Sequence, residues 1–219
     1  VVATAEGSDI GFASTWGDGQ FTSQLPGDFN VANAILVLAL LLKKGVPLDA
    51  ACDVMSQLSA PPGRMQRVAM DGPAAVIDYA HTPDALEVAL RALRAHCRGK
   101  LWCVFGCGGD RDKGKRPQMG EVAEQYSDCV VITTDNPRSE DARVIIGDIL
   151  AGLRHADRAT IIEDRAAAIA WTISQADDRD VVLIAGKGHE DYQESNGERI
   201  AFSDYAVAQK ALAASVSTQ

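Results

Sequence analysis

The sequence predicts an α/β fold, a doubly wound, mostly parallel Rossmann-like sheet that occupies the chain from about residue 65 onward. Three observations favour this fold. Short apolar runs recur at regular intervals, a segment with helical periodicity follows each run, and the runs are apolar throughout rather than alternating. Strands of that kind are buried on both faces, as in a parallel sheet covered by helices.

The first 58 residues have a different pattern. Residues 1–29 are expected to form strands joined by turns, with a hairpin signal at Gly17-Asp18-Gly19. An apolar helix over 29–45 and a second helix over 47–58 follow. The segment "SAPPGR", residues 59–64, reads as a linker, since its composition interrupts both patterns.

After the linker, strands and helices alternate. The expected strands are residues 74–80, 101–105, 129–134, 159–163 and 180–185. Helices are expected between them, the first capped by Thr82 with Pro83 at its first position. "YQESNGERIAF" predicts a hairpin that turns at Asn196-Gly197, and Ser203-Asp204 opens a final helix.

Composition excludes several classes of function. The net charge of −9 argues against nucleic acid or an anionic membrane as a partner. No run approaches the ~18 apolar residues of a membrane span, and the start has no signal-peptide pattern. The five cysteines include no CxxC pair, so a metal site from Cys103, Cys107 and a histidine lacks support. Reduced thiols in a cytoplasmic protein are the expectation.

The loops that follow the strands carry unusual residues. They read "DYAHTPD", "GCGGDRDKGKRP", "DNPRSED" and "GKGHED", whereas the turns at the opposite edge are plain. Each loop taken alone is explained by turn formation or by solvated charge. A dinucleotide fingerprint fails, because Arg111 stands where GxGxxG needs its last glycine. Because ligands bind beyond the carboxyl ends of parallel strands, the four loops together predict a site.

The chemistry of these loops indicates a class of ligand. Arg111 and Arg138 are planar forks that suit carboxylates, and Asp135 and Glu190 can accept hydrogen bonds from an ammonium. Such a set fits a zwitterion with more than one carboxyl group. A phosphate is the alternative, because Arg111 begins a basic cluster that also includes Lys113, Lys115 and Arg116.

Six motifs together resemble the Mur ligase family, from about residue 20 to the end: "GDFNVANA", "PPGRMQRV", "DYAHTPDAL", "FGCGGDRDKGKRPQMG", "TTDNPRSED" and "IAGKGHEDYQ". "DNPR" is the mark of the branch that adds meso-diaminopimelate to UDP-N-acetylmuramoyl-L-alanyl-D-glutamate. The resemblance implies ATP-dependent amide formation in peptidoglycan precursor synthesis, with ATP and Mg²⁺ as cofactors. The implied ligands are meso-diaminopimelate, ATP and the UDP-MurNAc-dipeptide.

The resemblance also implies roles for individual residues. For diaminopimelate these residues are Arg111, Asp135, Asn136, Arg138, Gly186 and Glu190. Arg138 and Asn136 would hold the distal end of the amino acid, the Gly186 backbone and Glu190 its ammonium, and Arg111 the other carboxylate. For the nucleotide the residues are Asn33, Arg64, Asp78 and, with less support, His81.

The chain departs from the family in one respect, since it has no GxxxxGKT/S phosphate loop. We therefore expect residues 1–58 to be the C-terminal remnant of a central ATP-binding domain, 59–64 a linker, and 65–219 the domain that binds the amino acid. On this view the central domain of the whole ligase supplies Mg²⁺ binding, an N-terminal domain binds the UDP-sugar, and this chain alone is expected to be inactive. The alternatives are a folylpolyglutamate synthase-like ligase domain and a non-catalytic module that binds an amino acid or a nucleotide.

Overall fold

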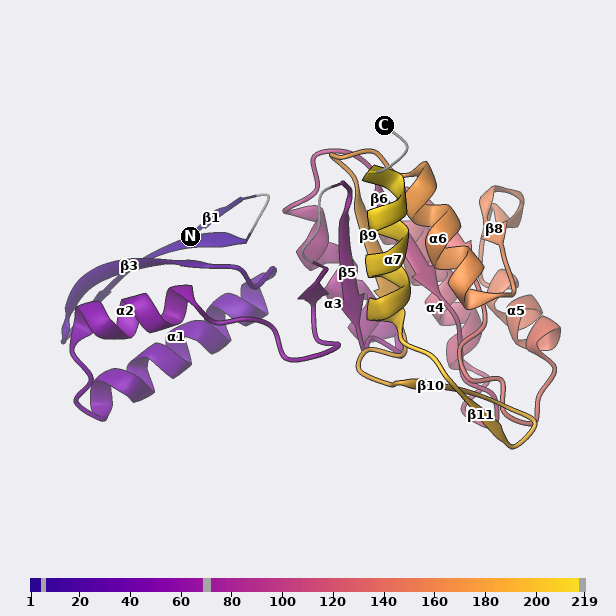
Figure 1. The fold of residues 1–219 in the computed structure, drawn as a ribbon, viewed down its shortest axis with the longest axis horizontal. Coiled ribbons are helices and arrows are strands. Elements are labelled where there is room, and N and C mark those ends of the chain that lie inside the picture. The colour runs from indigo at the N-terminus through magenta and orange to yellow at the C-terminus, as the bar shows by residue number, and fades with distance from the viewer. Residues whose placement is uncertain (5–6, 69–71, 217–219) are drawn as a thin grey trace.

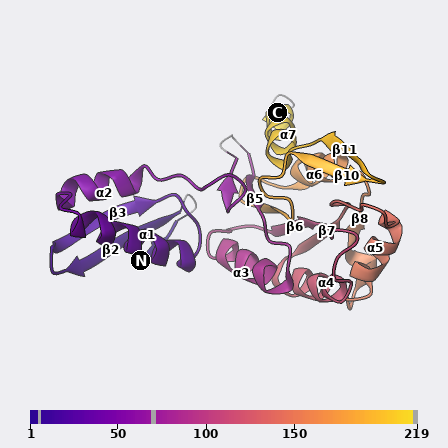
Figure 2. The same ribbon diagram turned by 90° about the horizontal axis from the view of Figure 1, so that it is seen from below.

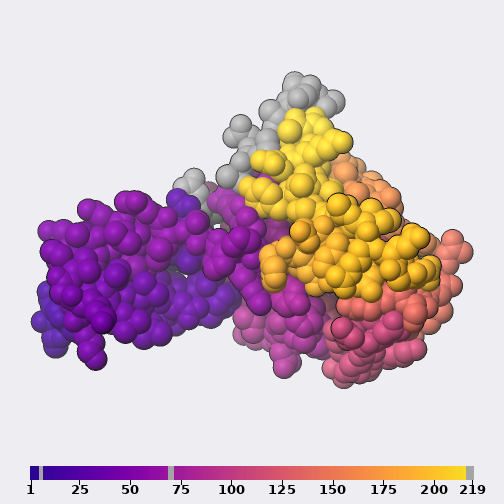
Figure 3. Space-filling view, turned by 60° about the horizontal axis from the view of Figure 1, so that its bottom comes forward, coloured from indigo at the N-terminus to yellow at the C-terminus, as the bar shows by residue number. Residues whose placement is uncertain are grey.

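A computed structural model describes residues 1–4, 7–68 and 72–216 of the chain. Two lobes are visible, a smaller one that contains the elements up to α2 (Leu48–Ser56) and a larger one that contains β4 (Gln66–Arg67) and the elements after it (Figures 1 and 3). In the smaller lobe an antiparallel sheet packs against two helices around a core that includes Ile10, Phe21, Leu38 and Met55. Its elements are β1 (Val2–Ala3), β2 (Ser8–Ser14), β3 (Gly17–Ser23), α1 (Asp28–Lys43) and α2 (Leu48–Ser56).

The hairpin of the smaller lobe turns two residues earlier than the sequence predicts. Ser14 pairs with Gly17, so the turn is Thr15-Trp16 and the predicted Gly17-Asp18-Gly19 lies inside β3. The Ser14 hydroxyl sets this position, because it accepts the Trp16 N–H at 3.2 Å and donates to the Gly17 carbonyl at 2.8 Å. Gly17, with φ of 119°, still supplies the conformation that the turn requires.

Helix α1 exposes much of its apolar surface. Leu36 is 61% exposed and Leu40 is 54% exposed, while Ala34, Leu38 and Leu42 on the opposite side are buried. A helix that is apolar nearly all round normally has neighbours on both sides. The exposed side of α1 is therefore an apolar surface without a partner among the described residues.

The larger lobe has the predicted α/β fold, with strand order β4-β5-β9-β6-β7-β8 and every pair parallel except β4 with β5. The short edge strand β4 was not predicted. The elements are β4 (Gln66–Arg67), β5 (Ala74–Asp78), α3 (Pro83–Arg94), β6 (Leu101–Phe105), α4 (Lys115–Tyr126), β7 (Cys129–Ile132), α5 (Ala142–Leu150), a 3₁₀ turn (Ala156–Arg158), β8 (Thr160–Ile161), α6 (Arg165–Gln175), β9 (Val181–Ala185), β10 (Tyr192–Ser195), β11 (Glu198–Ala201) and α7 (Asp204–Val216).

Helices cover both faces of this sheet (Figure 2). Leu86 and Leu90 of α3, Met119 of α4 and Ile149 of α5 belong to the core on one face. Helices α6 and α7 pack on the other face, where Ile169 contributes to a second core. After β8 the chain crosses back over the sheet and inserts β9 between β5 and β6. That reversal opens a crevice at the carboxyl ends of these strands, the usual place for a ligand.

The two lobes are in contact through α3 and the turn that follows it. His96 Nδ1 lies 2.7 Å from the Thr4 carbonyl, and the Gly27 N–H donates to His96 Nε2 at 3.4 Å. These contacts require the neutral imidazole with its proton on Nδ1. A Cβ on Gly27 would lie 2.7 Å from the Ala92 methyl, so glycine permits this close approach.

No helix among the described residues is both long enough and apolar enough to span a bilayer. All five cysteines are free, which agrees with the expectation of reduced thiols. Burial raises the pKa of Cys107 to about 12, so this thiol beside the crevice stays protonated.

Candidate functional site

Four loops at the carboxyl edge of the sheet line a cavity of about 480 Å³, and they follow β5, β6, β7 and β9. This convergence on one edge is the arrangement that the sequence predicts. All six residues assigned to the amino acid lie on its wall: Arg111, Asp135, Asn136, Arg138, Gly186 and Glu190. We refer to this space as the amino-acid cavity. The role of each residue in it stays a prediction.

Arg138 is held by the β10–β11 hairpin. Its φ of 53° lies in the left-handed region, which is costly for a residue with a side chain. The Arg138 N–H donates to the Glu194 carbonyl at 3.1 Å, and its carbonyl accepts the Asn196 N–H at 2.6 Å. Nη1 donates to the Gly109 carbonyl at 2.8 Å. In the described part of the chain only Nη1 of the guanidinium is engaged, so Nε and Nη2 keep their hydrogens for a ligand.

Asp135 is a nearly buried carboxylate on the cavity wall. It is 8% exposed, and its side chain accepts no hydrogen bond from any described residue. Burial raises its pKa, while Arg165 and Lys187 lower it. Gly186, with φ of 115°, permits this placement, because a Cβ there would lie 2.6 Å from Asp135 Oδ2. A ligand ammonium would supply the partner that this carboxylate lacks.

Asn136, Lys187 and Glu190 form a hydrogen-bonded triad, in which Asn136 and Lys187 are buried. Asn136 Nδ2 donates to Glu190 Oε2 at 2.8 Å, and the Lys187 ammonium donates to Asn136 Oδ1 at 2.9 Å and to Glu190 Oε2 at 3.2 Å. The Glu194 N–H also donates to Asn136 Oδ1, at 2.9 Å. Within the described residues, Glu190 Oε1 has no donor. It is the oxygen that Glu190 can offer to a ligand.

Arg111 lies at the outer rim of the cavity on an exposed loop, where its Nη1 donates to the Asp110 carbonyl at 3.1 Å. Glu140 fixes this loop, since it accepts the Asp110 N–H at 2.6 Å and two hydrogen bonds from the Arg116 guanidinium. Arg116 is fully buried and also bonds Asp148 at 2.8 Å. The Arg116 of the predicted basic cluster therefore supports the loop instead of facing a phosphate.

Acid should weaken this support, which gives a testable pH dependence. The hydrogen bonds from Arg116, Asp110 and Lys113 lower the pKa of Glu140 from 4.5 to about 2. A carboxyl whose pKa is lower in the folded state than in the unfolded state stabilises the fold at pH above its unfolded-state pKa. That stabilisation is lost as the pH falls through its folded-state pKa. We expect Glu140 to make the free energy of unfolding fall between about pH 4.5 and 2. In Glu140→Gln, the free energy of unfolding from urea denaturation should fall less steeply over the same pH range. Equal slopes for both proteins would contradict this.

A second cavity, of about 370 Å³, lies between α1, the linker and the start of α3. Three of the four residues assigned to the nucleotide line it: Asn33, Arg64 and Asp78. Asn33 and Arg64 are exposed. Asp78 is already engaged, because its two oxygens accept the Met65 and Ala80 N–H groups at 2.8 Å each. Asp78 therefore joins Met65, the residue directly after the linker, to the end of β5.

His81 lies apart from the other three nucleotide candidates, on the wall of the amino-acid cavity. Its Nδ1 is 2.8 Å from the Tyr79 carbonyl, and the two rings are 4.7 Å apart. The Arg64 guanidinium stacks over the same Tyr79 ring, 4.8 Å from its centroid. Tyr79 thus lies between the two cavities.

The linker is packed against the site. Gly63, with φ of 67°, sits directly on the backbone of Gly188 and His189, where a Cβ would overlap both. A glycine is therefore required at this position. The "PPGR" turn, which lines the second cavity, therefore packs directly on the "GKGH" loop, which lines the amino-acid cavity.

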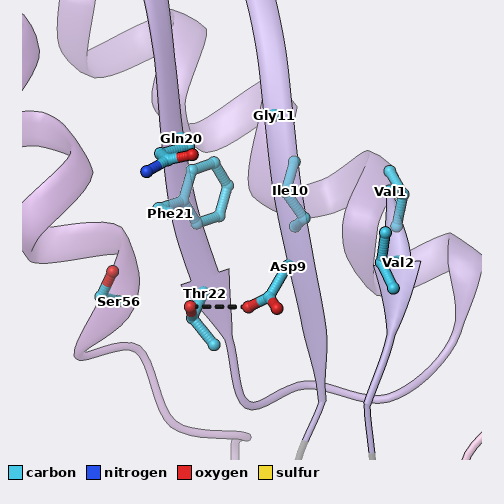
Figure 4. A pocket seen from close by; sticks show the side chains of 9 residues that line it. All are labelled: Val1, Val2, Asp9, Ile10, Gly11, Gln20, Phe21, Thr22 and Ser56. Atoms are coloured by element: carbon cyan, nitrogen blue, oxygen red, sulfur yellow. Dashed lines mark hydrogen bonds between the residues drawn. The ribbon is translucent and has the colours of Figure 1, made fainter.

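A larger cavity, of about 620 Å³, lies in the smaller lobe and carries no such chemistry (Figure 4). Strands β1, β2 and β3 line it, together with Ser56 of α2. Its one carboxylate, Asp9, already accepts the Thr22 hydroxyl at 2.8 Å. None of the predicted site residues is among its lining residues.

No group of three or more His, Cys, Asp or Glu side chains within the described ranges is arranged to hold a metal ion. Mg²⁺ is usually held by one or two carboxylates together with substrate phosphates and water.

Several supporting residues escaped the sequence analysis. Lys187 was seen only as part of a glycine-rich loop, and Tyr192 only as a hairpin residue, although it lines the amino-acid cavity. Arg165 bonds Asp204 at 2.7 Å and donates to the Thr134 carbonyl, in the loop after β7, and to the Ala185 carbonyl at the end of β9. An arginine at the start of an otherwise apolar helix was the available signal for this pair.

Comparison with known proteins agrees with this geometry. The profile of the Mur ligase, glutamate ligase domain matches residues 63–188. A curated relative, the UDP-N-acetylmuramoyl-L-alanyl-D-glutamate–2,6-diaminopimelate ligase of Haemophilus influenzae (strain PittEE), is 50% identical over 204 residues. The match covers 93% of the chain and 42% of that relative.

Two solved structures are also similar to this chain. One described as a UDP-N-acetylmuramoyl-L-alanyl-D-glutamate–2,6-diaminopimelate ligase has a TM-score of 0.80 at 42% identity, and the match covers 97% of this chain and 44% of that one. A folylpolyglutamate synthase from Thermotoga maritima has a TM-score of 0.66 at 20% identity, over 84% of this chain and 42% of that one. The latter likeness shows a shared fold. The chain spans less than half the length of these relatives.

Proposed function

The chain belongs to the Mur ligase family, and on that premise we propose that it is the C-terminal part of a ligase that adds meso-diaminopimelate to UDP-N-acetylmuramoyl-L-alanyl-D-glutamate. The observation that carries the proposal is the amino-acid cavity, where Arg111 and Arg138 line the same space as Asp135 and Glu190. The 50% identity to a ligase named for that reaction supports it.

The proposed reaction forms an amide in two steps. The D-glutamyl carboxylate takes the terminal phosphoryl group of ATP, which gives an acyl phosphate and ADP. A neutral amine of diaminopimelate then attacks the acyl carbon, phosphate leaves, and the amine loses a proton. This chain contributes binding and orientation, since holding the amine close to the acyl carbon converts a bimolecular step into an effectively unimolecular one.

Each charged end of diaminopimelate has a counterpart in the cavity. Arg138 offers its free guanidinium hydrogens to the distal carboxylate, and Asp135 and Glu190 Oε1 offer acceptors to the distal ammonium. Arg111 at the rim is placed for the proximal carboxylate. The Gly186 N–H is taken by the Asp78 carbonyl at 3.1 Å, so its own carbonyl is what it can offer.

For the nucleotide we propose the cavity of Asn33, Arg64 and Asp78, with His81 assisting from the neighbouring wall. ATP supplies the phosphoryl group when bound. An amide and an exposed guanidinium suit one end of a nucleotide. The Mg²⁺ that accompanies ATP would be held outside the described residues, by the central domain of the ligase and the phosphates.

The domain assignment follows from the same proposal. Residues 1–58 would be the end of the ATP-binding domain, with the apolar side of α1 covered by the rest of that domain. Residues 59–64 would link it to the amino-acid-binding domain of 65–219. Five free thiols and the class of substrate favour a cytoplasmic location.

A folylpolyglutamate synthase is the second candidate, favoured only by the shared fold. It would add glutamate, which has no distal ammonium. The buried, unpartnered Asp135 and the free oxygen of Glu190 would then have no partner, so the cavity argues against it.

The experiment is an assay of ADP release by the whole ligase that contains this chain. We expect turnover with meso-diaminopimelate and the UDP-MurNAc-dipeptide, little with L-lysine, and none with the 219-residue chain alone. Glutamate-dependent turnover on a folate substrate would overturn the proposal in favour of the synthase. Turnover by the isolated chain would overturn the division of labour between domains.

A further inference from the structure

Lys187 is a completely buried lysine, at 0% exposure, next to the amino-acid cavity. Lysine is seldom buried unless it is paired. Both of its hydrogen-bond acceptors, Asn136 Oδ1 and Glu190 Oε2, belong to residues assigned to the amino acid. Its ammonium also lies 5.5 Å from the ring centroid of Tyr192, another residue of the cavity wall.

These bonds determine which way the Asn136 amide points. Oδ1 accepts from Lys187 and from the Glu194 N–H, and Nδ2 donates to Glu190. Turning the amide over would set its NH₂ against two donors and its oxygen against a carboxylate. The amide orientation is thus fixed by its partners, with Lys187 as the only charged donor among them.

Lys187 also determines which oxygen of Glu190 is free. Oε2 takes the hydrogen bonds from Lys187 and Asn136, which leaves Oε1 without a donor among the described residues. The carboxylate is held by two donors at one end and open at the other. Such a preorganised acceptor loses little side-chain entropy when a ligand binds.

We propose that Lys187 is a positioning residue for recognition of the ligand's distal ammonium, acting through Asn136 and Glu190 without touching the ligand. This deepens the proposed function and rests on it. Lys187 also places a buried ammonium 3.2 Å from Glu190 Oε2, and its charge lowers the pKa of Asp135.

Removing Lys187 should weaken ammonium binding even though it removes a positive charge from the site. The reason is geometric, because Glu190 and Asn136 lose the donor that orients them. We expect affinity to fall on the order of tenfold or more, comparable to loss of a charged hydrogen bond.

The test compares two ligands that differ only at the distal end. meso-Diaminopimelate carries the second ammonium, and 2-aminoheptanedioate lacks it. Calorimetric titration of the 219-residue chain should show at least about tenfold weaker diaminopimelate binding in Lys187→Met, with 2-aminoheptanedioate affinity changed less than about threefold. Lys210→Met, on the exposed side of α7, is the matched control and should leave both affinities unchanged.

The outcomes are distinguishable. Equal losses for both ligands would show a purely structural role, and an unchanged or tighter diaminopimelate affinity would overturn the proposal as well. If Lys187→Met does not fold, Lys187→Gln keeps a polar group in the buried position but is too short to reach both partners, and the same selectivity loss is expected. Failure of the unsubstituted chain to prefer diaminopimelate over 2-aminoheptanedioate would instead count against the proposed function itself.

Discussion

Arg138→Ala is expected to abolish the preference for meso-diaminopimelate over L-lysine. The two ligands differ by one carboxylate, the group that we assign to the free guanidinium hydrogens of Arg138. Losing one partner of a partly desolvated charge pair costs roughly 2–5 kcal/mol, so diaminopimelate affinity should fall about thirtyfold to several thousandfold. Lysine affinity should change little, since lysine has no carboxylate for this residue.

Two further variants sharpen this prediction. Arg138→Lys keeps the charge but not the planar fork, and should recover only part of the affinity. Arg143→Ala removes a neighbouring arginine whose side chain is 79% exposed and paired with Glu163 outside the cavity, and should leave both affinities unchanged. Parallel losses for diaminopimelate and lysine in Arg138→Ala would show that the residue holds the loop without selecting the ligand.

The second large effect is on stability. Arg165 and Asp204 form an ion pair with both side chains at 0% exposure, and Arg165 also donates to the Thr134 carbonyl after β7 and to the Ala185 carbonyl at the end of β9. Arg165→Met removes the partner of the buried Asp204 side chain. We expect a loss of about 3–5 kcal/mol in the free energy of unfolding, measured by urea denaturation.

The matched control is again a surface arginine. Arg143→Met breaks an exposed pair with Glu163 and should cost at most about 1 kcal/mol. The double variant Arg165→Met with Asp204→Leu replaces the buried pair with apolar groups and should regain much of the lost stability. A loss no larger in Arg165→Met than in the control would contradict the buried-pair account.

The sequence predicts most of the larger lobe because its signals are local. Thr82 precedes α3 and accepts the Ala85 N–H at 3.3 Å, as a cap should, and the run 101–105 is β6 itself. The loops of the cavity were also found from sequence, because parallel strands put their carboxyl ends together. The predicted position of the hairpin turn in the smaller lobe was wrong. The prediction relied on the glycines, whereas the hydrogen bonds of Ser14 fix the turn two residues earlier.

The remainder depends on contacts between distant segments. The Lys187–Asn136 bond joins residues 51 apart, and the Arg165–Asp204 pair joins residues 39 apart. No periodicity or turn rule reports such pairs. The same holds for the strain at Arg138, which is held by the hairpin and has no local cause. Sequence alone therefore predicted residues that line one cavity and missed those that hold them in place.

The most direct measurement is calorimetric titration of the unsubstituted 219-residue chain with meso-diaminopimelate and, separately, with L-lysine. The account predicts saturable binding of diaminopimelate and at least about thirtyfold weaker binding of lysine, because Arg138 is already fixed by the hairpin before any ligand arrives. Equal affinity for the two amino acids, or no binding by a chain shown to be folded, would contradict the claim that this lobe carries a preformed site that selects the second carboxylate.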